Sequence, residues 1–83
     1  MNKEKALDLL ESIAWLTKPL AKTCEKAIDS AENEEEKKKI KDATKLLLRG
    51  HYELIDYIRK NFPELDPNGQ ASDLFLELQK KYE

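Results

Sequence analysis

Apolar residues recur with the period of an α-helix in three segments of the chain, residues 6–31, 34–60 and 70–82. Advancing each residue by about 100° places the apolar side chains of each segment on one stripe. The expected core residues are Ala6, Leu7, Leu10, Ile13, Ala14, Leu20, Ala21, Cys24, Ala27, Ile28 and Ala31 in the first segment; Ile40, Ala43, Leu47, Leu54, Ile58 and Phe62, flanked by Leu48 and Ile55, in the second; and Ala71, Leu74, Phe75, Leu78 and Tyr82 in the third. The pattern predicts an all-α protein.

Pro19 lies inside the first segment, yet the apolar stripe keeps its phase on both sides of it. Proline removes the backbone hydrogen bond to the carbonyl of Trp15 and disfavours helical geometry at Lys18. The chain therefore either kinks at residues 16–19 and continues as a helix, or breaks there and turns back. The retained phase favours the kinked continuation.

Capping and turn residues mark the other boundaries. Asn33 is expected to cap the second helix, with Glu36 at the capping-box position three residues later. Pro63 and Pro67 end that helix, and the sequence PNG predicts a turn. Leu65 is expected to anchor this loop in the core.

These segments predict an antiparallel helical hairpin, its first arm kinked or broken at Pro19, with a short C-terminal helix folded back on it. The result is a three- to four-helix bundle that forms one domain over residues 1–83. The second helix spans ~40 Å and the last less than ~20 Å, so the last cannot cover a hairpin with a continuous first arm. Either the first arm folds back at Pro19, or a second copy completes the core as a homodimer.

Composition narrows the class of protein further. Val is absent, aromatic residues are 7% of the chain and charged residues are 39%, which disfavours a β-sheet domain and is typical of a charged helical surface. The single cysteine, Cys24, fits a reducing compartment. The N-terminal residues form no signal peptide and no segment is apolar enough for a membrane span. We therefore expect a soluble cytoplasmic protein with no membrane partner.

The only tryptophan, Trp15, falls nearly opposite the first stripe, on the expected outer side of its helix. It either packs on Pro19 or under the last helix, or it anchors a protein interface, since tryptophan is enriched among interface hot spots. Other leucines also lie off their stripes or widen them. The candidate interface residues are Trp15, Leu9, Leu16, Leu46 and Leu76.

The residues that could carry chemistry are few. His51, the only histidine, lies among leucines and an isoleucine at helical spacing and is expected at the core or its edge, held by a hydrogen bond. Cys24 is expected to be a buried structural thiol. Gly50, unfavourable in a helix, suggests close approach of another helix near Trp15. No catalytic residue, metal site or cofactor is expected, and the chain is not expected to be an enzyme.

Three functions remain open from the sequence. The leading hypothesis is a self-associating protein-binding module that acts through the helix face around Trp15. The first alternative is a nucleic-acid-binding module, which the net charge of -2 does not favour. Its binding face would consist of Lys38, Lys41, Lys45, Arg49 and Arg59. The second alternative is a small immunity- or inhibitor-type protein that neutralises a protein target, an analogy of size and fold class alone.

Overall fold

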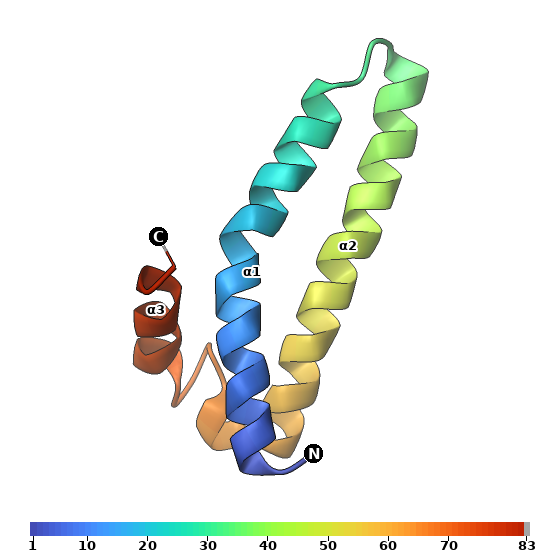
Figure 1. Cartoon of the computed structure of the whole chain (residues 1–83). Helices are drawn as coiled ribbons and strands as arrows, with labels where there is room; N and C mark the ends of the chain where they lie inside the picture. The colour runs from blue at the N-terminus through green and yellow to red at the C-terminus, as the bar shows by residue number, and fades with distance from the viewer. Residues whose placement is uncertain (83) are drawn as a thin grey trace.

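The computed structural model describes residues 1–82 and contains helices α1 (Lys3–Asp29), α2 (Glu34–Asn61) and α3 (Ser72–Lys80). A short 3-10 turn, η1 (Pro63–Leu65), joins α2 to the last segment, and the described part of the chain contains no strand. Helices α1 and α2 form an antiparallel hairpin, and α3 lies along the outer side of α1 (Figure 1). The expected all-α hairpin with a short C-terminal helix is confirmed.

Helix α1 continues through Pro19 as one element of 27 residues, so the chain does not turn back there. At its start, the side-chain oxygen of Asn2 accepts a hydrogen bond from the backbone N–H of Lys5 at 2.8 Å. Pro19 is exposed, and Trp15 is 51% exposed. The Trp15 carbonyl, which cannot accept from Pro19, therefore lies on a side of the helix that water reaches.

Helix α2 begins and ends where its capping residues require. The Asn33 side-chain oxygen accepts from the backbone N–H of Glu36 at 2.8 Å, which confirms the expected N-cap. Pro63, which cannot donate a backbone hydrogen bond, begins η1 two residues after Asn61, the last residue of α2. Leu65 is 5% exposed and packs in the core, as expected for the residue that anchors the loop.

The main hydrophobic cluster lies at one end of the hairpin, which we call the base. The base holds the chain's N-terminus and η1. This main cluster has five buried residues, and partly buried residues of α1, α2 and α3 pack around them. The buried set consists of Ala6, Leu10, Ile13, Ile58 and Leu65. Helix α3 has 9 residues and is therefore only ~14 Å long, against ~40 Å for α1. It covers the base alone.

The line of contact between α1 and α2, called here the seam, becomes polar beyond the base. His51 is 8% exposed, and its Nε2 lies 3.3 Å from the hydroxyl of Thr17 across the seam. Thr44 and Cys24, further along, are also buried. The expected burial of His51 with a hydrogen-bond partner and the expected burial of Cys24 are both confirmed.

Several residues expected in the core are exposed instead. Leu47 is 52% exposed and Leu54 46%, because α2 is rotated so that Thr44, His51 and Ile58 face α1. One flank of this row packs at the base through Ile55 and Phe62; the other flank has no covering element in residues 1–82. The same expectation is wrong for Leu7, Ala21, Ala43 and Tyr82, which are exposed.

Gly50 also differs from its expected role. A side chain built at Gly50 would meet nothing within 4 Å, so no helix of the same chain approaches it closely. The α1 residue that meets α2 at this level is Thr17, which contacts His51 and lies two residues from Trp15. The part of α1 near Trp15 therefore does lie beside α2, as expected. It faces His51, however, and Gly50 is exposed to solvent.

Candidate protein-binding face

One face of the hairpin carries rows of apolar residues that are largely exposed on α2 and half-buried at Leu9 of α1. In α1, Leu9 and Leu16 come one residue before the seam residues Leu10 and Thr17. In α2, Ala43, Gly50 and Tyr57 come one residue before the seam residues Thr44, His51 and Ile58. A step of one residue turns by about 100° in the same sense in both helices, and because the helices are antiparallel, both rows lie on the same face.

We call this surface the open face, because α3 lies on the other side of α1. Tyr82, just after α3, lies beside Ala14, Trp15 and Lys18, which point away from the rows just described. Leu20, Leu47 and Leu54 lie between the rows and the seam, and Leu46 lies at the outer edge of α2. The open face consists of Leu9, Leu16, Leu20, Ala43, Leu46, Leu47, Gly50, Leu54 and Tyr57.

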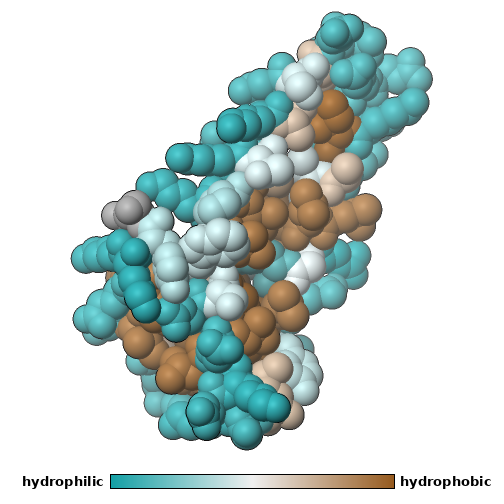
Figure 2. All heavy atoms as spheres, viewed as in Figure 1, coloured by the Kyte–Doolittle hydropathy of each residue, from teal (hydrophilic) through white to brown (hydrophobic). Residues whose placement is uncertain are grey.

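The large side chains that α2 contributes to the open face are well exposed to solvent, whereas Leu9 and Leu20 of α1 are half-buried. The exposed fraction is 71% for Leu46, 52% for Leu47, 46% for Leu54 and 51% for Tyr57. Figure 2 shows hydrophobic side chains gathered along the hairpin on the face turned to the viewer. An apolar surface that runs along both helices is a feature of interaction sites, whereas single exposed leucines are ordinary.

Trp15 belongs to a different region, which we call the Trp15 corner. Its side chain lies with that of Tyr82 in two shallow hollows between α1 and the end of α3. Glu11 holds this end in place, since its Oε1 accepts from Lys81 Nζ at 2.7 Å and from the Tyr82 hydroxyl at 2.8 Å. The hydrogen bond from Lys81, followed by that from Tyr82, lowers the pKa of Glu11 below its usual range.

The structure thus separates the five residues expected to form one interface. Leu9 and Leu16 lie on the open face and Leu46 lies at its edge, whereas Trp15 lies at the corner beside α3. Leu76 is 54% exposed and lies on α3, outside the core cluster.

Sequence reasoning missed the other members of the open face, having placed Ala43, Leu47 and Leu54 in the core. A signal was present in α2 at positions 43, 47, 50, 54 and 57. Their spacing of four, three, four and three residues is that of a helix-packing stripe.

The two side chains best suited to catalysis or metal binding are buried. His51 contacts Thr17 across the seam, and Cys24 is a free, buried thiol. Among residues 1–82, no group of three or more His, Cys, Asp or Glu side chains is arranged to hold a metal ion.

The expected basic face of α2 is partly neutralised by acidic neighbours. Arg49 Nε lies 3.1 Å from Glu53 Oε1, and an Arg59 guanidinium nitrogen lies 2.7 Å from Asp56 Oδ1. Lys38, Lys41 and Lys45 are exposed. Two of the five basic side chains therefore form ion pairs with acidic residues of α2 itself.

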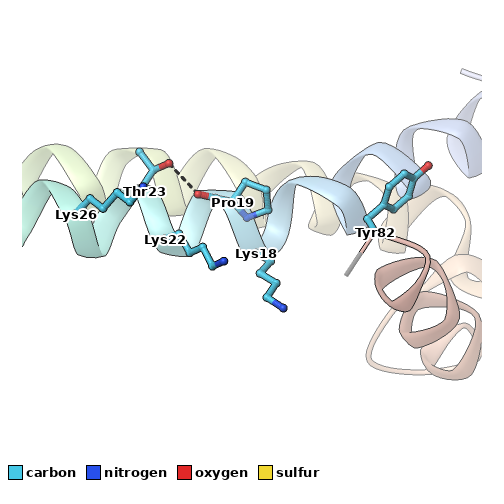
Figure 3. A pocket seen from close by; sticks show the side chains of 6 residues that line it. All are labelled: Lys18, Pro19, Lys22, Thr23, Lys26 and Tyr82. Carbon is cyan, nitrogen blue, oxygen red and sulfur yellow. Dashed lines mark hydrogen bonds between the residues drawn. The ribbon is translucent and has the colours of Figure 1, made fainter.

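A second basic surface was not expected from the sequence. Figure 3 shows Lys18, Lys22 and Lys26 following one side of α1 past Pro19, with Tyr82 at one end of the hollow that they line. The hydroxyl of Thr23 donates to the Pro19 carbonyl at 2.8 Å inside this hollow. The lysines are spaced four residues apart, which places them on one side of the helix.

Across residues 1–82, none of the helices combines the length and the apolar character needed to cross a lipid bilayer. No protein-family model matches the chain, and neither a curated protein nor a solved structure matches it.

Proposed function

We propose that this chain is a protein-binding module that self-associates through the open face and has no catalytic activity of its own. The observation that supports the proposal is the row of exposed apolar side chains along α2, facing the same way as Leu16 of α1. We place its action in the cytoplasm, where a free thiol such as Cys24 stays reduced.

The energetics of the open face favour a covered state. Complete burial of a leucine side chain is worth about 1.5–3 kcal/mol. Leu46, Leu47 and Leu54 are each about half exposed or more, so covering them contributes roughly 1 kcal/mol apiece. Helix α3 packs on the other side of α1 and does not cover this surface, so a second molecule could cover it.

The position of His51 supports a non-catalytic function. The chain has one histidine, and its ring lies in the seam against Thr17, 8% exposed. A general acid or base must reach the proton that it transfers on a bound substrate. His51 instead serves the packing of α1 against α2.

The test is the solution mass measured by light scattering over a hundredfold range of concentration. We expect the mass to rise from 9.7 kDa towards twice that value as concentration rises. Leu47→Glu should keep the protein monomeric, because a buried carboxylate without a partner is costly.

Leu76→Glu is the matched control, since it makes the same change at a 54% exposed leucine away from the open face. It should leave the mass as in the wild type. A wild-type mass that stays at 9.7 kDa throughout would refute self-association. Loss of the dimer with Leu76→Glu or Trp15→Ala, but not with Leu47→Glu, would move the interface to the α3 side of the molecule.

A second candidate function, binding of a nucleic acid, is favoured by the lysines that line the hollow in Figure 3. It predicts retention of a labelled single-stranded oligonucleotide at low salt, with affinity that falls steeply as salt rises. Lys22→Glu should abolish that binding while leaving the mass of the protein unchanged. No retention at low salt would exclude this candidate.

A further inference from the structure

We propose that the second copy lies on the open face in the opposite orientation, so that the tip of each hairpin meets the base of the other. The tip is the connection between α1 and α2, residues 29–36. The two-fold axis would pass beside Gly50 of α2 and Leu16 of α1. This arrangement rests on the self-association proposed above and adds its geometry.

The sizes of the α2 side chains are complementary about Gly50. In two antiparallel copies of α2 that cross at residue 50, each residue faces the one equally far on the other side of the axis. Ala43 then faces Tyr57, a small side chain against a large one, and Leu46 faces Leu54. Gly50 faces itself, and the free space around it allows the two backbones to approach.

The charges at the two ends of the hairpin favour the same orientation. Residues 29–36 contain five acidic residues and no basic one: Asp29, Glu32, Glu34, Glu35 and Glu36. Of these, only Glu35 is in an ion pair within the described residues, with Lys39. Two copies placed tip to tip would bring ten carboxylates together within about a Debye length.

Two segments of the base, residues 1–5 and 59–64, have a small excess of positive charge. Residues 1–5 and 59–64 contain Lys3, Lys5, Arg59 and Lys60 against the two acids Glu4 and Glu64. Lys3 pairs with Glu64 and Arg59 with Asp56, while no ion pair of residues 1–82 includes Lys5 or Lys60. Lys5 and Lys60 are therefore available to the acidic tip of a second copy.

The size of the face is compatible with a dimer interface. The Cα positions extend over 45 × 25 × 19 Å, so the broad side of the molecule has a projected area of roughly 1,100 Å² at most. A specific interface of standard size buries about 800 Å² on each side. Leu16, near the middle of α1, would meet its own symmetry mate and extend the contact beyond α2.

Distances between spin labels test the orientation. Single cysteines replace the exposed residues Glu36 or Lys60 in a Cys24→Ser background, and pulsed electron resonance measures label-to-label distances in the dimer. Residue 36 lies 14 positions from residue 50, so two labels at 36 should be about 40 Å apart. Labels at 60 should be about 30 Å apart, and a mixture of the two variants should give a distance under about 20 Å.

Each possible result decides the question. The tip-to-tip alternative predicts the reverse. Dimers of a single labelled variant should then give a distance under about 20 Å, and mixed dimers of the two variants about 36 Å or more. That result would overturn the proposed orientation and leave self-association standing. A monomeric mass would instead refute self-association itself, and with it this arrangement. Charge reversal by Lys5→Glu with Lys60→Glu should weaken a tip-to-base dimer at least tenfold at low salt and far less at high salt.

Discussion

Replacing Gly50 with alanine should stabilise the isolated chain. Gly50 lies inside α2, is exposed and has no left-handed backbone angle, and an added Cβ would meet nothing within 4 Å. Alanine therefore brings its full advantage in helix propensity, about 0.8–1 kcal/mol, with no steric cost. The entropy of unfolding for 83 residues is roughly 170 cal/mol/K, so the melting temperature should rise by about 5–6 °C.

The assay is thermal unfolding followed by circular dichroism at low micromolar concentration, where the chain should be monomeric. Gly69→Ala provides the contrast, because its Cβ would lie 3.2 Å from Asp66 Oδ2. The same carboxylate accepts from the Asn68 backbone N–H at 2.9 Å, so it cannot move away freely. Gly69→Ala should therefore give a smaller rise or a fall. A melting temperature that is unchanged or lowered in Gly50→Ala would refute the inference that this site is empty in the monomer.

Three further predictions concern the core, the helix cap and the α3 contact. Leu10→Ala removes a fully buried side chain from the base and should lower the free energy of unfolding, measured in urea, by about 2–5 kcal/mol. Leu46→Ala, at an exposed leucine, should change the free energy of unfolding of the monomer by less than about 0.5 kcal/mol. Equal effects of the two substitutions would contradict the assigned core. Asn33→Ala removes the cap of α2 and should cost about 1 kcal/mol in the same assay, whereas no loss would mean that the cap is not formed in solution. Because its partners lower the pKa of folded Glu11, the contact with Lys81 and Tyr82 stabilises the fold above the ordinary glutamate pKa and is lost as pH falls through the lowered value. The NMR shift of the Tyr82 amide should therefore differ between wild type and Glu11→Gln at pH 7 and converge only as pH falls through the lowered pKa of Glu11. A difference that is constant with pH would contradict the contact.

The path of the chain could be predicted from the sequence because local signals agreed with one another. The stripe of α1 keeps its phase across Pro19, and a proline on the solvent side of a helix costs little packing, so the helix continues. Asn33 caps α2 as its side chain and spacing indicate. Leu65, a large apolar residue between two prolines of the loop, lies in the core.

The rotation of α2 could not be predicted, because hydrophobicity alone does not determine which flank of a wide stripe is covered. Leu47 and Leu54 are more apolar than Thr44 and His51, so the sequence places the leucines at the centre of the buried stripe. In the structure, the side chains of Thr17 and His51 form a hydrogen bond across the seam, so both polar groups can be buried there at little cost.

The open face also differs from the interface predicted from the sequence, because the sequence does not show which side of a helix is covered. Trp15 and Leu16 are adjacent in sequence but about 100° apart on the helix, and α3 packs beside Trp15. Only the tertiary position of α3 shows which side of the hairpin stays uncovered. The length of the last helix correctly indicated that α3 cannot cover the whole hairpin, but not which side it packs on.

The most direct test of the open face is the set of backbone amide NMR shifts recorded while the protein is diluted from millimolar to micromolar concentration. Self-association through this face predicts concentration-dependent shifts at Leu16, Leu47, Gly50 and Leu54, with the amide of Leu76 on α3 unchanged. Shifts centred on Trp15 and Leu76 instead, or no shifts over the whole range, would contradict the claim that this face binds a second copy.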